Sequence, residues 1–318
     1  MTLAAPEPLA GLDYPRTLRE FTVFFPDDRT CLDYLARLRW PGGFVCPACG
    51  GTRAWRMRKG RNLRCAGCRA DASITAGTIF ADTRLPLGTW FAAAWYACSQ
   101  KPGVSALGLK RVLGLGSYET AWALLHKLRR AMVRPGRELL SGELEVDESY
   151  LGGPRPGKRG RGALGKQIVA IAAEALPRGT IGRIRMARIP DCSEEVLTGF
   201  VAAAAEPGSV IYTDHWSGYK GLAGAGFQHW PTNISASGDP AHVAMPRVHR
   251  VASLLKRWLL GTHHGGVKPG QLDAYLQEFV FRFNRRTSRQ RGLVFYRLLQ
   301  QAVQVDPVPF GRLIARRS

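Results

Sequence analysis

Two groups of side chains in this sequence are suited to binding metal ions, and the first is a set of four cysteines. Cys46 and Cys49 form one Cys-x-x-Cys pair, Cys65 and Cys68 form a second, and 15 residues separate the pairs. Thiolates from two such pairs fill a tetrahedral Zn²⁺ site and leave no position for water, so the predicted site is structural. The alternative is a set of buried or redox-active cysteines. Thioredoxin-like chemistry, however, uses a single pair beside a βαβ unit.

The second group is a pair of aspartates. Asp147 follows the apolar residues Leu144 and Val146, and Asp214 ends the apolar run 210–212. Two carboxylates that converge at one edge of a sheet can hold Mg²⁺ or Mn²⁺ and align an attacking and a leaving oxygen on phosphorus. The pair therefore predicts metal-dependent phosphoryl transfer, whereas a turn or cap role is the alternative for either aspartate alone.

The segments around the aspartates predict the elements that must position them. Strands are expected over 142–153, 166–175, 182–190 and 209–219, with a helix capped by Ser193 before the last strand. Three strands, a helix and a further strand are the element order of a ribonuclease-H-like domain. We therefore predict a mixed α/β fold in which helices flank a mixed β-sheet.

A basic hairpin is predicted between the two cysteine pairs. Residues 52–64 read as a strand, a turn over 59–62 and a second strand, with Trp55 interleaved among arginines. A solvated charge run is the usual explanation of such a pattern, but the interleaved aromatic favours a surface that faces phosphate. The candidate nucleic-acid contacts here are Arg56, Arg58, Lys59 and Arg61.

Residues 103–134 predict a helix-turn-helix. Ser105 and Ser117 are suitable N-caps, and Gly114 and Gly116 end the first helix. On the second helix an apolar face alternates with a basic face, which suits the major groove of DNA, although any amphipathic surface helix shows this pattern. The side chains expected to project from the basic face are His126, Lys127, Arg130 and Arg134.

Composition identifies the class of partner. Lys and Arg total 45 against 24 Asp and Glu, a net charge of +21, which favours nucleic acid over a merely basic or ribosome-associated protein. No apolar run approaches the roughly 18 residues of a membrane span, and the first residues do not resemble a signal peptide. We expect no membrane partner and a cytoplasmic, nucleoid-associated protein. Seven cysteines, an odd number, do not predict a disulfide framework.

Five segments together resemble a known family. They are FPDDRTCLDYLARLRWPGGFVCPACGG, EVDESYLGG, YTDHWSGY, VHRVASLLKRWLLGTHH and YLQEFVFRFNRR. In this order they resemble bacterial insertion-sequence transposases that join an N-terminal zinc ribbon to a DDE-type catalytic domain, over about residues 20–300. The resemblance implies that Asp147 and Asp214 are the first two acidic residues of the metal site.

The third position of the family's metal site, which varies among glutamate, asparagine and histidine, matches His249, with Lys256 as its basic partner. The 34 residues between Asp214 and His249 suit such a triad, and His249 and Lys256 are seven apart on one expected helix. Imidazole ligates divalent ions but favours softer metals than Mg²⁺, so two hypotheses stay open. His249 is a ligand in a site that Mn²⁺ serves well, or it moves a proton or contacts phosphate.

Other residues compete for the third position. Glu148 should point to the opposite face of its strand from Asp147, and Glu278 is interpreted as structural, paired with Arg282. Asp239 is a more distant competitor.

The glycine-rich stretch 152–162 follows the first catalytic strand and suits a loop that admits the DNA backbone, with a flexible linker as the alternative. Its candidate DNA contacts are Arg155, Lys158 and Arg159.

The resemblance implies a transposase that recognises terminal inverted repeats, cleaves DNA and joins the ends to target DNA, with homo-oligomers forming on the element ends. A stand-alone metal nuclease and a DNA-binding regulator with a relict catalytic domain are the alternatives. The predicted parts are a helical lead-in (1–40), a zinc ribbon (41–75), a helical region with the helix-turn-helix (76–137), the catalytic domain (138–300) and a tail (301–318).

Overall fold

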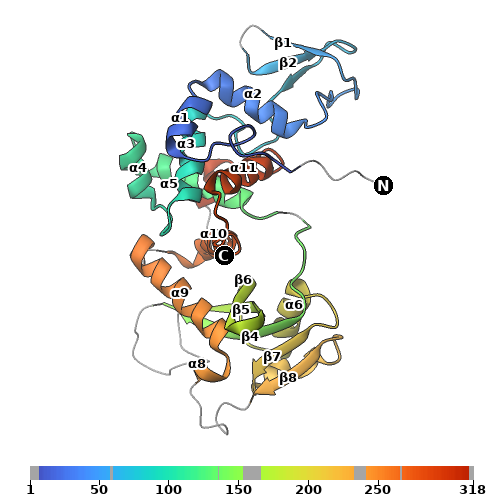
Figure 1. The fold of residues 1–318 in the computed structure, drawn as a ribbon, viewed down its shortest axis with the longest axis vertical. Coiled ribbons are helices and arrows are strands. Elements are labelled where there is room, and N and C mark those ends of the chain that lie inside the picture. The colour runs from blue at the N-terminus through green and yellow to red at the C-terminus, as the bar shows by residue number, and fades with distance from the viewer. Residues whose placement is uncertain are drawn as a thin grey trace. The chain divides into compact units, whose positions relative to one another are not determined.

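The chain folds into two compact units. The computed structural model describes residues 7–57, 60–134, 136–152, 166–232, 241–265 and 267–314. Among these, unit 1 contains the residues up to Arg134 together with those from Thr287 onward, and unit 2 contains the residues between. Figure 1 shows the elements of each unit along the chain. None of the described helices is both long enough and apolar enough to cross a membrane.

Unit 1 combines a small sheet with a cluster of helices. Its antiparallel sheet has the order β1-β2-β3. The strands are β1 (Ala54–Arg56), β2 (Asn62–Cys65) and β3 (Asp71–Ser73). The helices are α1 (Leu18–Phe24), α2 (Asp28–Arg39), α3 (Leu87–Ser99), α4 (Ala106–Leu113), α5 (Tyr118–Ala131), α11 (Arg291–Ala302) and α12 (Phe310–Ile314).

Helix α11 belongs to unit 1, although all but its last two residues fall in the range 138–300 that we predicted as the catalytic domain. Its Phe295 is fully buried and packs edge-on against Phe21 of α1 and Phe91 of α3, with ring centroids 5.7 and 5.9 Å apart. The apolar face of this helix is visible in the sequence, but the core that it fills is not. A fragment of unit 1 must therefore retain α11, because a chain ending near Arg137 would leave this core uncovered. The other predicted boundaries stay predictions.

The predicted helix-turn-helix is confirmed as α4 and α5, which pack against each other. The hydroxyls of Ser105 and Ser117 each accept a backbone N–H at 3.0 Å, from Gly108 and Thr120. Gly114 ends α4 with φ of 63°, a left-handed conformation that glycine adopts without steric cost. The caps therefore fix the turn between the two helices.

Unit 2 is built on a five-stranded mixed sheet with the order β6-β5-β4-β7-β8. Strands β4, β5 and β6 pair antiparallel, and β7 and β8 run parallel to β4. The strands are β4 (Glu143–Leu151), β5 (Gln167–Ala175), β6 (Ile181–Ile189), β7 (Val210–Asp214) and β8 (Gln228–Thr232). The predicted ribonuclease-H-like arrangement is confirmed.

Helices of unit 2 cover both faces of this sheet (Figure 1). Alternate residues of β5 serve two cores, with Val169 and Ile171 on one face and Ala170 and Ala172 on the other. The first core contains α9 (Pro246–His263) and α10 (Leu272–Phe283), and the second contains α6 (Glu194–Ala204). The remaining helical segments are η1 (Pro177–Gly179), η2 (Ser217–Leu222), α8 (Ala241–Ala244) and η3 (Pro269–Gln271).

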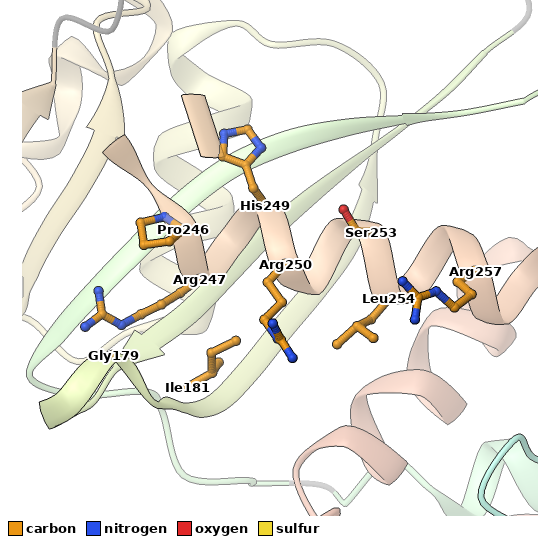
Figure 2. A pocket seen from close by; sticks show the side chains of 9 residues that line it. All are labelled: Gly179, Ile181, Pro246, Arg247, His249, Arg250, Ser253, Leu254 and Arg257. Carbon is orange, nitrogen blue, oxygen red and sulfur yellow. The ribbon is translucent and has the colours of Figure 1, made fainter. Parts of the chain in front are cut away.

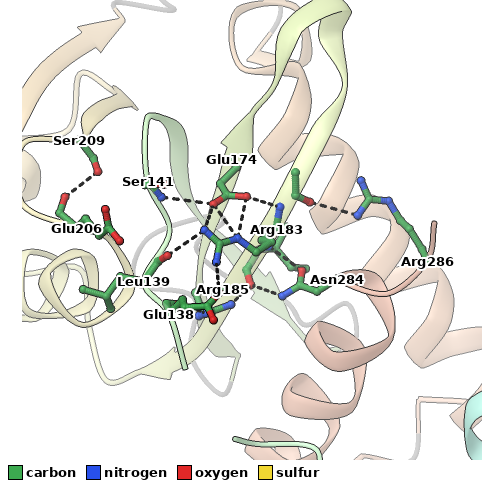
Figure 3. Close-up of polar contacts among 12 residues, drawn as sticks. Glu138, Leu139, Ser141, Glu174, Arg183, Arg185, Glu206, Ser209, Asn284 and Arg286 are labelled. Atoms are coloured by element: carbon green, nitrogen blue, oxygen red, sulfur yellow. Dashed lines mark hydrogen bonds and ion pairs between the residues drawn. The ribbon is translucent and has the colours of Figure 1, made fainter. Parts of the chain in front are cut away.

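A partly buried ion pair fixes the segment that leads into β4 (Figure 3). The carboxylate of Glu174 on β5 accepts hydrogen bonds from the side chain and the backbone N–H of Arg183 on β6. The same guanidinium donates to the carbonyl of Leu139 at 3.0 Å, and Arg185 donates to the carbonyl of Glu138. Because these contacts join β5 and β6 to the chain just before β4, they set where β4, the strand that carries Asp147, begins.

Candidate functional site

The four cysteines converge as the sequence predicts. Their sulfur atoms all lie within 4.8 Å of one another. The Sγ atoms of Cys46 and Cys68 are 3.7 Å apart and those of Cys49 and Cys65 are 3.6 Å apart. A Zn–S bond of about 2.3 Å gives tetrahedral S–S separations of about 3.8 Å. The cluster therefore fits a structural zinc ion.

Each cysteine pair sits on the same kind of tight turn. The N–H of Cys46 donates to the carbonyl of Gly51, and that of Cys65 donates to Ala70, both at 2.9 Å. Gly50 has φ of 73°, and Arg69, at the equivalent position of the second turn, has φ of 64°. Backbone N–H groups of the second turn lower the pKa of the Cys65 thiol to about 7. The second turn thus presents at least one thiol that ionises readily toward a cation.

Several basic residues of unit 1 have structural partners. Arg56 forms an ion pair with Asp33 of α2 and donates to the carbonyl of Gly60. Lys127 is half-buried with its ammonium 5.8 Å from the centroid of the Trp90 ring, and burial lowers its pKa. These contacts occupy two of the side chains that we predicted as DNA contacts.

Other basic residues of unit 1 are exposed. Arg61 of the hairpin and Arg130 and Arg134 at the end of the second helix face solvent. His126 does not project as expected, because it is 4% exposed and stacks on Trp122 with ring centroids 4.0 Å apart. Arg58, Lys59, Arg155, Lys158 and Arg159 lie outside the described residues, and their predicted DNA contacts stay predictions.

The two aspartates lie on neighbouring parallel strands. The register of β4 and β7 pairs Glu145 with Tyr212, and Asp147 and Asp214 each follow two residues later. The register therefore places the two carboxylates at the same level of the sheet. Residues at even separation on a strand share a face, so Asp147 lies on the α9 side of the sheet with Glu145.

Glu148 points to the opposite face of the sheet from Asp147, as predicted, and its side chain contacts the segment after β7. Its carboxylate accepts a hydrogen bond of 2.8 Å from the hydroxyl of Tyr219, which lies on η2 after β7. Tyr219 is fully buried, and burial together with the Glu148 charge raises its pKa. This bond joins the residue next to Asp147 to the segment that follows Asp214, so it helps to hold β4 and β7 in their relative position.

Helix α9 carries His249 to Asp147. The Nε2 atom of His249 lies 3.7 Å from an Oδ of Asp147, and their side chains are 29% and 18% exposed. The site is therefore partly open to solvent and to a ligand. Lys256 is exposed two turns further along α9, about 10 Å along the helix axis.

Glu145 anchors the beginning of α9, a role that sequence reasoning missed. The N-cap residue Met245 provides no side-chain cap. Instead the buried carboxylate of Glu145 accepts the backbone N–H groups of Arg247 and Val248 at 2.7 and 2.9 Å. It also forms an ion pair of 2.8 Å with the Arg247 guanidinium. Because Glu145 lies two residues before Asp147 on β4, this cap fixes the start of α9 beside the first aspartate.

The remaining competitors for a third ligand lie elsewhere. Glu278 is buried within α10, and its predicted pairing with Arg282 stays a prediction. Asp239 is outside the described residues. Among the described residues, the cysteines are the only set of three or more possible ligands whose atoms lie within 4.8 Å of one another. Asp147, Asp214 and His249 would supply only part of a ligand set for Mg²⁺ or Mn²⁺, which fits the several water ligands that Mg²⁺ retains in proteins.

Comparisons with known proteins match the cysteine cluster and the aspartate-bearing unit to two separate domains. The family model described as the ISXO2-like transposase domain matches residues 139–284, which include both aspartates and His249. The transposase zinc-ribbon domain matches residues 26–71, which include all four cysteines. The chain is also similar to a Halobacterium salinarum protein named "Uncharacterized protein in transposable element ISH50". The two are 26% identical over 287 residues, which cover 84% of this chain and 94% of the relative.

Proposed function

Since the chain belongs to the insertion-sequence transposases that carry a zinc ribbon and a DDE-type catalytic domain, we propose that it binds the terminal inverted repeats of its element and catalyses metal-dependent DNA cleavage and strand transfer. The observation that carries the proposal is the level placement of Asp147 and Asp214 on parallel strands, with His249 3.7 Å from Asp147. The zinc ribbon and the helix-turn-helix are proposed to recognise the repeats.

Asp147 and Asp214 would hold Mg²⁺ or Mn²⁺ at the edge between β4 and β7. When bound, such an ion stabilises the negative charge that develops around phosphorus in the transition state. Asp147 also faces His249, so its carboxylate orients the imidazole ring. His249 then either completes the ligand set or takes the proton from the attacking oxygen.

The two reactions exchange one phosphodiester bond for another. In cleavage, a water oxygen attacks phosphorus, the bond from phosphorus to the 3′ oxygen breaks, and that oxygen takes up a proton to become a 3′-hydroxyl. In transfer, this hydroxyl loses its proton and attacks a phosphorus of target DNA, where the bond to the target's own 3′ oxygen breaks. Neither reaction requires a covalent link to the enzyme. Lys256, exposed on α9, is placed to bind a backbone phosphate near the reacting one.

The test is an assay of cleavage and joining with the full chain. The DNA that flanks the gene supplies the paired repeats for the substrate duplex, and products are separated on denaturing gels with Mg²⁺ or Mn²⁺. We expect wild type to cut at the repeat end and to join that end to a second duplex. Asp147→Asn should abolish both products while DNA binding persists. The exposed Asp273 of α10 provides the matched control, and Asp273→Asn should behave as wild type.

Two outcomes would overturn the proposal. Cutting without joining identifies a nuclease on the same fold. The second outcome is that wild type does not cleave DNA and that Asp147→Asn binds or regulates DNA as well as wild type does. This result identifies a regulator with a relict catalytic domain.

A further inference from the structure

A groove of about 500 Å³ lies along α9 on the side of unit 2 that adjoins the catalytic residues. One wall is the turn between β5 and β6, represented by Gly179 and Ile181, and the other wall is α9. Figure 2 shows Arg250 and Leu254 on the side of α9 that faces Ile181, with the His249 ring on the other side of the helix.

The side chains that form the α9 wall are predominantly basic. Arg247, Arg250 and Arg257 all line the groove, and none of its described lining residues is acidic. Arg247 is already neutralised by Glu145. Arg250 and Arg257 are exposed, and neither forms an ion pair with any carboxylate of the described residues. The groove therefore contains two positive charges without a counter-charge from the part of unit 2 that is described.

Arg250 and Arg257 are spaced so that both can contact the phosphates of one DNA strand. Pro246, Arg250, Ser253 and Arg257 recur every three or four residues and form one stripe along α9. Arg250 and Arg257 are two turns apart, about 10 Å along the helix axis. Phosphates of one DNA strand recur about every 3.4 Å along the helix axis. Because this spacing is shorter than the distance between the two arginines, their guanidinium groups can reach different phosphates of the same strand.

The position of the groove identifies which DNA would occupy it. His249 is among the residues that line the groove, and its ring, on the other side of α9, lies 3.7 Å from Asp147. The first turns of α9 therefore border both the groove and the proposed catalytic site. A strand whose reacting phosphate is at Asp147 must continue in some direction across the surface of unit 2. A basic groove without acidic lining is a favourable path, because it supplies counter-charge without desolvating a carboxylate.

We propose that Arg250 and Arg257 form a sequence-independent site for the sugar-phosphate backbone of the DNA strand that enters the catalytic site. This inference rests on the proposed function for the identity of the strand. Guanidinium groups bind phosphate oxygens through two parallel N–H donors, and the exposed Ser253 hydroxyl offers a further donor between them. The site positions DNA and reads no bases.

The experiment measures the DNA affinity of the zinc-loaded full chain over a series of salt concentrations. No Mg²⁺ or Mn²⁺ is added, so that no cleavage takes place. The probes are a duplex of random sequence and a duplex that carries the element end. The variants are the double substitution Arg250→Gln with Arg257→Gln, the charge-preserving Arg250→Lys with Arg257→Lys, and the control Lys268→Gln. Lys268 is an exposed cation of the same unit outside the groove.

We expect the slope of log affinity against log salt to become shallower by about 1.8 in the glutamine variant, since each phosphate contact contributes about 0.9. The loss should be the same for both duplexes, and the lysine variant and the Lys268 control should keep the wild-type slope. An unchanged slope in the glutamine variant would overturn the proposal. A loss confined to the element-end duplex would also overturn it, because the groove would then read sequence.

The outcome is separable from that of the proposed function. Failure of cleavage or joining by wild type would remove the transposase assignment and leave the metal-free slope unaffected. Thermal unfolding of the glutamine variant provides the folding check, and an unchanged midpoint is expected because both side chains are exposed.

Discussion

The cysteine cluster and the proposed carboxylate site both have residues suited to metal ions, but the chain assembles them in different ways. The cysteines lie between Cys46 and Cys68, and two short turns with matching backbone hydrogen bonds bring them together. The proposed catalytic residues extend from Asp147 to His249, and their positions depend on the register of β4 with β7 and on the Glu145 cap of α9. A local site can be inferred from spacing, whereas a distant one requires knowledge of which elements are neighbours.

Among the described residues, each region contains arginines that are paired with a carboxylate, such as Arg247 of α9 with Glu145, and arginines that are not, such as Arg61 in the ribbon. In the ribbon, Arg56 and Arg64 are paired with Asp33 and Asp71. Along α9, Arg250 and Arg257 have no carboxylate partner among the described residues. Density of positive charge in the sequence is therefore a poor guide to which cations are available for DNA.

Loss of zinc should have the largest effect. Cys49→Ser should remove a ligand and unfold the region of about residues 41–75, because a structural zinc supplies on the order of 10 kcal/mol to such a unit. Metal analysis and amide hydrogen exchange would measure the loss, and unit 2 should keep its protection. Cys192→Ser, outside the ribbon, is the control. Wild-type protein without zinc, or a protected ribbon in Cys49→Ser, would contradict the assignment.

Removing the cap of α9 should have the next largest effect. Glu145→Ala leaves Arg247 and two backbone N–H groups without their acceptor, which should cost about 3 kcal/mol of unfolding free energy. Glu145→Gln retains an acceptor and should cost less. Chemical denaturation would measure both. Glu143→Ala, at the exposed first position of the same strand, is the matched control and should change stability little.

Cleavage by these variants separates positioning from stability. If Glu145 places His249 beside Asp147, Glu145→Ala should lower the cleavage rate under conditions where the protein remains folded. An unaltered rate in folded Glu145→Ala would show that the cap does not position the site.

His249 distinguishes the two hypotheses for the third position. His249→Ala should lower the cleavage rate by about 100-fold if the imidazole moves a proton or binds metal. If His249 is a ligand, His249→Glu should restore activity with Mg²⁺, whereas for a proton carrier glutamate should be as damaging as alanine. The measurement is single-turnover cleavage across Mg²⁺ and Mn²⁺ titrations. Wild-type rates from His249→Ala at low metal concentration would exclude both roles.

Much of this site could be predicted from the sequence. The cysteine spacing defines the ribbon, and the apolar runs before Asp147 and Asp214 predict that each aspartate ends a strand. Asp214 does end β7, whereas the prediction for Asp147 is wrong, because β4 continues beyond it to Leu151. Alternation along β4 also predicted that Glu148 faces away from Asp147, toward what proved to be Tyr219. Each inference depends only on residues close together in the chain.

Other features could not be predicted because they depend on tertiary contacts. The role of Glu145 requires that α9 begin above β4, and the burial of His126 requires that Trp122 stack on it. Helix α11 shows an amphipathic pattern in the sequence, but only the aromatic core around Phe295 shows which unit it completes. The sequence does not single out Arg250 and Arg257, because their proposed role depends on having no carboxylate partner among the described residues, which only the structure shows.

The smallest effect is expected from single cations of unit 1. Arg130→Gln should make the salt slope of DNA binding shallower by about 0.9, because this side chain is exposed and one contact would be lost. Arg56→Gln should leave the slope unchanged and lower the stability of the ribbon, since Arg56 is paired with Asp33. Fluorescence titrations over a salt series would measure both. The reverse pattern would show that the ribbon arginine, and not α5, contacts DNA.

The central claim is that Asp147 and Asp214 share one divalent-cation site. Electron paramagnetic resonance of Mn²⁺ titrated into the zinc-loaded full chain tests it most directly, because it requires neither substrate nor turnover. Asp147→Asn and Asp214→Asn should each weaken the same Mn²⁺ binding event, while Asp273→Asn binds as wild type. Wild-type Mn²⁺ binding in both catalytic-site variants would contradict the claim.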